Sequence, residues 1–329
     1  MSTDPGELTV RRCRDDDRAA VIALCRASLG WQAGDPNEEF FSWKHDANPF
    51  GASPAWVAET GDGHLVGLRV FLRWRFRRPD GSTFDAVRAV DTATHPDWQG
   101  KGIFTKLTLG ALPDLVDDGV ANVFNTPNDK SRPGYLKMGW QQLGRAPVAV
   151  RVRSLLCVPK MASARTGAEK WSRPTDVGVD AAAFFEDVER TGRLLATAVA
   201  SSRICTDRTA EYLRWRYSFA PLHYRVAPIG HRAIDGVLVF RVRRRGDAVE
   251  LTVCDLIASP GQSARRTLGS LLRRCRADYA LVAGDHPLRT FGAVPAEQLG
   301  PVLTWRTLAS EHVPTLDELD LRLGDLELF

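Results

Sequence analysis

Residues 89–104 read AVDTATHPDWQGKGIF, and this stretch decides the fold that we predict for the chain. A strand rich in β-branched residues runs into His95-Pro96, then into a glycine-rich turn over 99–102, and then into an apolar-periodic helix from Ile103 to about Val116. The first backbone N–H groups of a helix have no acceptor inside it, and the helix dipole is positive there. The turn therefore predicts a site for the diphosphate of a phosphate-bearing cofactor.

Two common phosphate-binding loops do not fit this turn. A dinucleotide fold places Gly-x-Gly-x-x-Gly after its first strand, and a P-loop ends in Gly-Lys-Ser/Thr, whereas here Gly102 is followed by Ile103 and Phe104. The turn instead resembles the acyl-CoA loop of the GNAT superfamily of N-acyltransferases, Gln/Arg-x-x-Gly-x-Gly/Ala. The resemblance assigns cofactor binding to Gln99, Gly100, Lys101, Gly102, Ile103 and Phe104, the last standing where the family prefers Gly or Ala.

A second motif follows the apolar run over 120–124, which is typical of a short buried strand. Members of the family end this strand with Asn-x-x-Ala-x-x-Leu-Tyr-x-Lys-x-Gly-Phe. The chain has the matching residues Asn128, Ser131, Tyr135, Lys137, Gly139 and Trp140, with Ser131 at the small-residue position and Trp140 in place of Phe. Two motifs in the right order, about 30 residues apart, make the resemblance specific over residues 7–150.

Length and composition favour a globular protein of two domains. The 329 residues are 44% hydrophobic and 26% charged, and a chain of this length exceeds what one core usually organises. There is no apolar run of 18 residues, and the first residues lack the pattern of a signal peptide. We therefore expect a soluble, cytoplasmic protein that does not bind membranes.

Cysteine spacing and charge exclude several classes of site. The six cysteines are scattered and never form Cys-x-x-Cys, so neither a zinc site nor a disulfide framework is predicted, and no metal is expected. The net charge is only +4. The basic clusters over 73–78 and 241–245 alternate with apolar residues, which is typical of a solvated sheet face, so we expect no nucleic-acid partner.

The hydrophobic pattern predicts an α+β fold. Antiparallel strands with glycine-containing turns come first, and helices and strands alternate after them. The expected strands are 8–12, 55–59, 65–77, 83–94, 120–125 and 141–153, and the expected helices are 15–28, 36–45, 103–118 and 131–138.

The second half of the chain repeats the first. Residues 212–217 echo 40–45, and 253–260 echo 89–96 with the same spacing between Asp and Pro. The second copy has lost its cofactor loop, because residues 261–264 lack glycine at the later positions. The pattern is that of a diverged duplication.

We accordingly predict a GNAT domain over 1–153, a connector over 154–178 and a degenerate GNAT-like domain over 179–329. Each domain is expected to have a mixed, mostly antiparallel twisted sheet flanked by helices. Tandem GNAT proteins with one competent half resemble this arrangement, and we expect a monomer or a homodimer.

The resemblance also implies roles for single residues. Tyr135 stands where the family holds a tyrosine close to the CoA sulfur, and a phenol can donate a proton to a leaving thiolate. Backbone N–H groups near Ala93 or Thr94 are expected to meet the thioester carbonyl. Asn128, with Ser131 beside it, either binds the pantetheine arm or is a turn residue.

The general base remains open between three alternatives. Asp91 and His95 lie on one side of an alternating strand, together with Ala89 and Ala93, and either could take the amine proton. Asp255, the counterpart of Asp91 in the degenerate copy, favours a structural role for this carboxylate, and His95 could simply end the strand. A water relay is the third alternative, and Asp85 is a weaker candidate than these.

The predicted activity is transfer of an acetyl group from acetyl-CoA to an amine of a small-molecule acceptor in a ternary complex. A protein amine is the alternative acceptor within the same chemistry. A non-catalytic acyl-CoA-binding sensor or scaffold is the alternative of another class. A third class, a nucleic-acid-binding protein, predicts salt-sensitive affinity for DNA.

Overall fold

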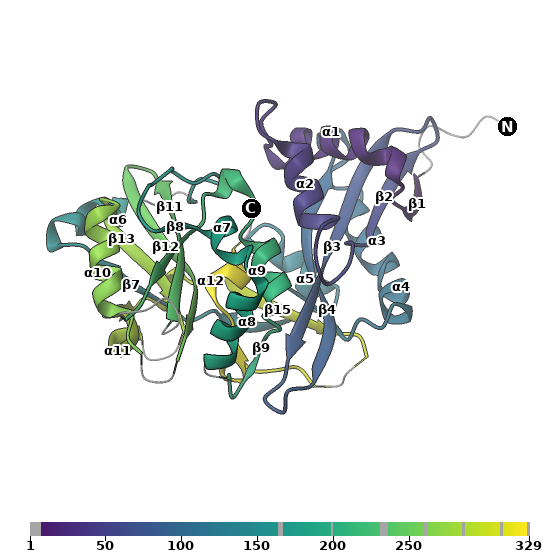
Figure 1. The fold of residues 1–329 in the computed structure, drawn as a ribbon. Helices are drawn as coiled ribbons and strands as arrows, with labels where there is room; N and C mark the ends of the chain where they lie inside the picture. Colours follow the sequence, from purple (N-terminus) through teal and green to yellow (C-terminus); the bar gives the residue numbers. More distant parts are fainter. Residues whose placement is uncertain are drawn as a thin grey trace. The chain divides into compact units, whose positions relative to one another are not determined.

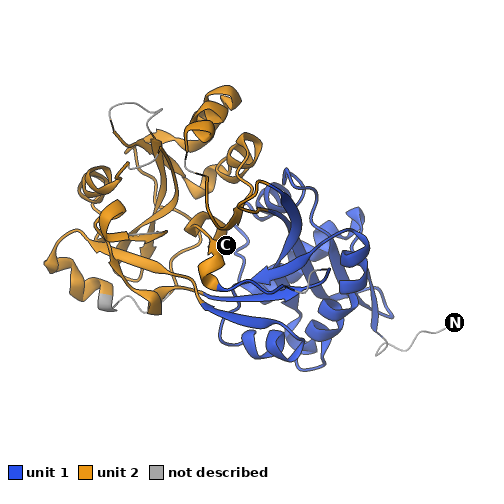
Figure 2. Cartoon of the chain, turned by 90° about the horizontal axis from the view of Figure 1, so that it is seen from below, with its two compact units in different colours: residues 1–76, 82–144, 302–315 blue, residues 77–81, 145–301, 316–329 orange. Residues whose placement is uncertain are grey.

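The computed structural model describes residues 8–163, 167–198, 200–230, 236–259, 262–284, 287–309 and 312–327. The chain forms two compact units (Figure 2). Unit 1 comprises residues 1–76, 82–144 and 302–315, and unit 2 comprises 77–81, 145–301 and 316–329. The predicted α+β class with two mixed sheets is confirmed.

Unit 1 is built from a twisted sheet with helices packed on it (Figure 1). Its sheet runs in the order β1-β2-β3-β4-β5-β15-β6. Its elements are β1 (Leu8–Arg12), α1 (Arg18–Leu29), α2 (Asn37–His45), β2 (Ala55–Thr60), β3 (Leu65–Arg77), β4 (Thr83–Thr94), α3 (Ile103–Gly110), α4 (Leu112–Asp117), β5 (Asn122–Asn125), α5 (Arg132–Lys137), β6 (Gln141–Arg145) and β15 (Val302–Thr307), with short 3-10 helices at Asp15–Asp17 and Pro96–Trp98.

Unit 2 has a second sheet, in the order β14-β7-β13-β12-β11-β10-β8. The strands of this sheet are β7 (Val148–Val152), β8 (Val179–Asp180), β10 (Arg225–Pro228), β11 (Gly236–Arg245), β12 (Ala248–Ala258), β13 (Tyr279–Ala283) and β14 (Val294–Pro295). Two further short strands of the unit, β9 (Ile204–Thr206) and β16 (Leu319–Asp320), pair with each other and lie outside this sheet. Its helices are α6 (Val158–Ser163), α7 (Ala181–Phe185), α8 (Val188–Thr197), α9 (Ala210–Arg216), α10 (Arg265–Arg274), α11 (Pro287–Phe291) and α12 (Leu323–Leu326), with 3-10 turns at Leu155–Cys157, Ala220–Leu222, Glu297–Leu299 and Leu316–Glu318.

The two sheets share one strand order, with an exchange at one position. Each contains a parallel pair, β4 with β5 and β12 with β13. In each, the strand next to this pair comes from the other half of the sequence, since β15 pairs with β5 and β7 pairs with β13. Neither half of the sequence can therefore complete its own sheet.

Two elements that were predicted as continuous are each interrupted near a proline. The strand expected over 141–153 is two strands, β6 and β7, which lie in different sheets. Pro147 stands between them, and a proline has no N–H for a central strand. The helix expected over 103–118 is broken into α3 and α4 at Ala111, because Pro113 cannot continue the hydrogen-bond pattern of α3.

The predicted domain limits differ from the units at the exchanged strands. Residues 145–153 belong to unit 2, and 302–315 belong to unit 1. The connector expected over 154–178 contains the helix α6. Pro260 and Gly261, which belong to the expected second loop, lie outside the described residues.

The helix α3 packs closely on β3 because β3 has a glycine at the contact. A Cβ at Gly67 would lie 2.5 Å from Ile103 and 3.0 Å from Leu107. Ile103 and Leu107 belong to the apolar cluster that joins Trp56 and Phe71 of the sheet to α3 and α4. This contact sets the place where α3 begins.

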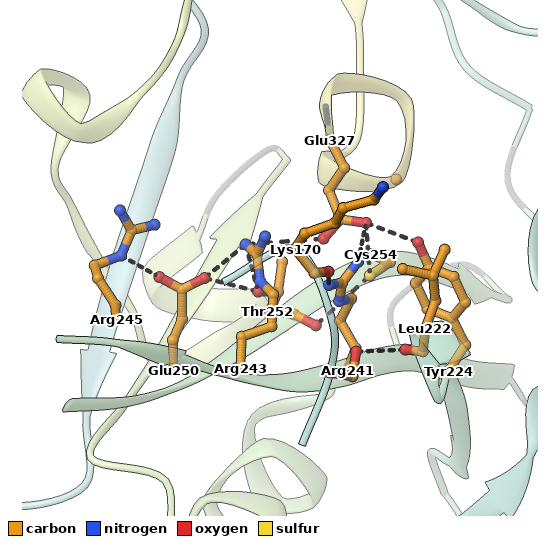
Figure 3. A network of polar contacts seen from close by, with 12 residues as sticks. Lys170, Leu222, Tyr224, Arg241, Arg243, Arg245, Glu250, Thr252, Cys254 and Glu327 are labelled. Atoms are coloured by element: carbon orange, nitrogen blue, oxygen red, sulfur yellow. Dashed lines mark hydrogen bonds and ion pairs between the residues drawn. The ribbon is translucent and has the colours of Figure 1, made fainter. Parts of the chain in front are cut away.

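A charged cluster lies in the interior of unit 2 (Figure 3). Glu327, whose side chain is 4% exposed, accepts a hydrogen bond from the Tyr224 hydroxyl at 2.9 Å. Its carboxylate lies 3.4 Å from Arg216, 3.7 Å from Arg241 and 3.8 Å from Arg243. Burial raises the pKa of Glu327, but the three guanidinium charges outweigh it and hold the pKa below its usual value.

This cluster corrects one prediction about charge. Arg241 and Arg243 were expected on a solvated sheet face, yet they are 0% and 9% exposed. Arg243 and Arg245 both bind Glu250, whose pKa they lower to about 2 against the effect of burial. Strand alternation alone cannot distinguish a solvated basic face from one covered by a later segment.

We expect Glu327→Gln to lower the free energy of unfolding by about 3–5 kcal/mol, because it removes the carboxylate charge that three buried guanidinium groups share. Urea denaturation at neutral pH measures this. The matched control is Glu189→Gln, since the Glu189 side chain is 90% exposed and bridges Arg193 only at the surface of α8. Equal stability of the two variants would show that the cluster does not need Glu327.

Candidate active site

The candidate site lies where two parallel strands of unit 1 separate. The ladder between β4 and β5 runs over Ala86–Arg88 and Asn122–Phe124, while β4 continues for six more residues to Thr94. Beyond this point β5 ends and the chain turns into α5. A gap between separating parallel strands is a common place for a ligand.

The glycine-rich turn before α3 has the conformation that its sequence predicts. Gly100 and Gly102 have φ of 76° and 74°, which favours glycine, and a Cβ at either position would meet no atom within 4 Å. The backbone of the turn is thus open on this side. Lys101 is exposed, with its ammonium 4.1 Å from the ring centroid of Trp98.

Phe104 connects this turn to Tyr135. The ring of Phe104, the second residue of α3, lies edge-on to the ring of Tyr135 with centroids 5.2 Å apart. It also lies against Gly134, where a Cβ would come within 2.8 Å of the ring. The Phe104 side chain therefore packs against α5, and the start of α3 is a neighbour of the Tyr135 phenol.

The Tyr135 hydroxyl is bound by an arginine of β3. Tyr135 is 4% exposed, and its oxygen accepts a hydrogen bond from Nη2 of Arg69 at 2.7 Å. Nη1 of the same guanidinium donates to the Thr92 hydroxyl of β4. Trp140 also lies edge-on to the Tyr135 ring, at 5.3 Å between centroids. The phenol is thus held by one hydrogen bond and by two ring contacts.

Asp91 lies in a buried cluster with two residues of α2. Its side chain is 5% exposed, and Oδ2 accepts hydrogen bonds from Lys44 Nζ at 2.7 Å and from His45 Nε2 at 2.7 Å. Nδ1 of His45 accepts from the Ser53 hydroxyl at 3.0 Å. The end of α2 is thereby fixed to β4 within the candidate site.

The backbone conformation of Asp91 interrupts the regular alternation of side chains along β4. Its φ of 41° is left-handed, which is unusual for a residue other than glycine. Val87 and Ala89 pack in the apolar cluster with α3, whereas the Asp91 carboxylate binds α2. The alternation that put Asp91 and His95 on one side with Ala93 is therefore wrong at Asp91.

The ionisation of this cluster follows from its burial and charges. Burial raises the pKa of Asp91, but the Lys44 charge and the His45 hydrogen bond outweigh it, so the pKa is held well below its usual value. Burial lowers the pKa of His45 below 6.5 despite the nearby carboxylate. Asp91 is therefore ionised and His45 neutral at pH 7, with the proton of His45 on Nε2.

The remaining strand residues end β4. His95 N–H donates to the Val66 carbonyl at 2.9 Å, and its Nδ1 accepts from Asp97 N–H at 3.4 Å. The His95 side chain is 40% exposed. Ala93 is buried, and the Thr94 carbonyl accepts from the Ser28 hydroxyl at 2.9 Å.

Asn128 forms a turn before α5. Its Oδ1 accepts from the backbone N–H of Lys130 at 3.0 Å, from that of Ser131 at 2.9 Å, and from the Ser131 hydroxyl at 3.1 Å. These bonds order the start of the helix that carries Tyr135. Gln99 and Ile103 flank the glycine turn, the former exposed and the latter buried.

Sequence reasoning missed Arg69, Thr92, Lys44 and His45. Lys44 and His45 end the helix α2, whose sequence is repeated at residues 212–217. This repeat, together with the repeated aspartate, could have pointed to a contact between the helix end and Asp91. Tyr217, the counterpart of His45, donates to Asp255 at 2.5 Å, as His45 does to Asp91. The same contact in both units identifies it as part of the fold.

The described residues hold no group of three or more His, Cys, Asp or Glu side chains that could bind a metal ion. In the same part of the chain, the helices are too short or too polar to cross a bilayer.

One segment of the chain matches a known protein-family model. Residues 9–143 match the family model of an acetyltransferase (GNAT) domain. No curated protein sequence matches the chain.

Solved structures support the fold of nearly the whole chain. A probable N-acyltransferase from Enterococcus faecalis V583 has a TM-score of 0.63 at 11% identity, covering 92% of this chain and 73% of the other. A GCN5-related N-acetyltransferase from Kribbella flavida has a TM-score of 0.60 at 17% identity, covering 92% and 71%. One from Anabaena variabilis has a TM-score of 0.60 at 13% identity, covering 92% and 73%. At these identities the likeness shows a shared fold.

We expect stability to fall as the pH drops from about 7 to about 5, because the unfolded chain protonates His45 more readily than the folded one does. Asp91 adds a further loss only below its usual value of 3.8, since its pKa is lower in the fold. Urea unfolding midpoints across this range measure the effect. His45→Gln keeps a neutral donor without a titration, so its midpoint should change less with pH. An identical slope in both proteins would contradict the assignment.

Proposed function

We propose that the chain, whose residues 9–143 match the model of an acetyltransferase (GNAT) domain, transfers an acetyl group from acetyl-CoA to an amine of a small-molecule acceptor. One observation carries this proposal. The start of α3, with its open glycine turn, neighbours a buried phenol at the point where β4 and β5 separate. The proposed diphosphate site and the proposed proton donor are thus joined by the contact of Phe104 with Tyr135.

The residues present fit the cosubstrate. The open turn at Gly100 and Gly102 and the first N–H groups of α3 would hold the diphosphate, and exposed Lys101 adds a positive charge nearby. Ile103 is buried against Gly67 of β3 and Phe104 packs on α5, so both side chains anchor the start of α3. When bound, acetyl-CoA supplies an activated acyl group.

Acyl transfer needs a proton donor for the leaving thiolate. We assign this role to Tyr135, whose hydroxyl is buried and held by Arg69. Backbone N–H groups near Ala93 and Thr94 are the proposed donors to the thioester carbonyl, because β4 no longer pairs with β5 there. A general acid of this kind accelerates the step about 10²–10⁴-fold.

The contacts of Asp91 argue against its use as the base. A carboxylate neutralised by Lys44 and bonded to His45 binds protons weakly. We therefore assign Asp91 to the structural cluster and propose that the amine proton leaves through half-exposed His95 or through solvent. A carboxylate with a lowered pKa is a weak base, which is the physical reason for excluding Asp91.

The proposed activity is tested by a screen of amines with acetyl-CoA, in which released thiol and acylated product are both measured. Product that forms with small amines supports the proposal. Acylation of peptide or protein amines alone would assign the other acceptor class. Binding of CoA without any turnover would identify a sensor.

We expect Tyr135→Phe to lower kcat at least ~10-fold and to leave CoA affinity unchanged, because the hydroxyl is assigned to proton donation and not to binding of the cosubstrate. Initial rates and calorimetry measure the two quantities. The control is Tyr279→Phe, which also loses a buried hydroxyl, bonded to Glu250 of unit 2 at 2.8 Å. Unchanged turnover of Tyr135→Phe would remove the assignment.

We expect Gly102→Ala to weaken CoA binding about tenfold, since straining the turn misdirects a hydrogen bond to a charged group. The control is Gly63→Ala. Gly63 has a similar left-handed φ of 86°, but it lies in the turn between β2 and β3, away from the glycine turn before α3. Both variants should lose similar stability in thermal unfolding. Equal CoA affinity of the two would show that the turn does not contact the cosubstrate.

A further inference from the structure

Arg69 is an unusual residue in the core of unit 1. It lies on β3 and is 0% exposed. Its guanidinium carbon lies 4.8 Å from the ring centroid of Phe71, 5.2 Å from that of Tyr135 and 5.6 Å from that of Phe104. Three aromatic rings therefore surround the charge.

In the described part of the chain, no carboxylate pairs with Arg69, and its Nε has no hydrogen-bond partner. The buried arginines of unit 2 differ, since Arg216 and Arg243 each pair with a carboxylate. Burial of a charge without a counter-ion costs several kcal/mol, of which ring contacts recover only part. Stability alone therefore does not explain Arg69.

The hydrogen bond to Tyr135 has only one possible direction. A guanidinium donates and never accepts, so the Tyr135 oxygen must accept from Nη2. The phenolic proton is then directed away from Arg69. Thr92, which accepts from Nη1, and the edge-on ring of Phe104 hold this arrangement in place.

We propose that Arg69 is the positioning residue that sets Tyr135 for acid catalysis, an inference that rests on the proposed acyl transfer. As the carbon–sulfur bond breaks and the carbon–nitrogen bond forms, the phenolic proton passes to sulfur and gives the free thiol. The phenolate left behind is paired with the Arg69 charge. The proton lost by the amine then restores the phenol through solvent.

The test is a double-mutant cycle of Arg69 and Tyr135. We expect Arg69→Met to lower kcat about 10–100-fold, with the KM values for acetyl-CoA and amine changed about twofold or less. Arg69→Lys, which keeps the charge and a donor, should recover part of the loss. In the Tyr135→Phe background, Arg69→Met should cost about twofold or less, because the two residues act as one unit.

Arg88→Met is the matched control. Arg88 is 2% exposed on the neighbouring strand β4, donates to the Thr126 hydroxyl at 3.0 Å and lies 5.8 Å from the Phe124 ring centroid. It should lose similar thermal stability and keep its kcat. Temperatures of unfolding of all variants separate stability from catalysis.

The outcomes separate the inference from the proposed function. If the wild type transfers acetyl groups and Arg69→Met either keeps its kcat or loses as much without the Tyr135 hydroxyl as with it, the inference is overturned and acyl transfer stands. If the wild type binds CoA but acylates no amine, both are overturned. Loss of kcat only where Tyr135 is present supports the inference.

Discussion

The short strand β5 is the element on which the candidate site depends. Its first three residues pair in parallel with β4 on one side, and all four pair antiparallel with β15 on the other. β15 lies about 180 residues further along the chain, and its Trp305 packs on Phe124 with ring centroids 6.1 Å apart. Without this exchanged strand, β5 would have unpaired backbone groups on one side. The gap between β4 and β5 thus depends on residues from the end of the sequence.

The same exchanged strand also fixes the helix that carries the phenol. Arg306 of β15 donates to the carbonyl of Met138, which ends α5. Its guanidinium carbon lies 5.1 Å from the Trp140 ring centroid, and Trp140 contacts Tyr135. A chain of contacts therefore leads from β15 to the Tyr135 ring. This explains why the motif around Tyr135 does not by itself form the site.

Local signals predicted much of the fold, and long-range pairing accounts for the rest. The strands over 65–77 and 83–94 have the predicted bounds because alternation and glycine turns are local. The glycine conformations at the turn before α3 were predictable for the same reason. The pairing of β15 with β5 and the contact of Arg69 with Tyr135 were not predictable, because these residues are far apart in the sequence and meet only in the folded sheet.

Comparison of the two units shows which contacts of the candidate site occur in both and which occur in unit 1 alone. The aspartate bonded to the end of a helix occurs in both units, as Asp91 and Asp255. The residue after it differs. In unit 1 it is Thr92, bonded to Arg69, whereas in unit 2 it is Leu256, paired with buried Leu238 of β11. The copy without the glycine loop thus has two leucines where the copy with the loop has a hydroxyl and a buried charge. Because a leucine pair satisfies a sheet interior at lower cost, the arginine in unit 1 is best explained by what it does to Tyr135.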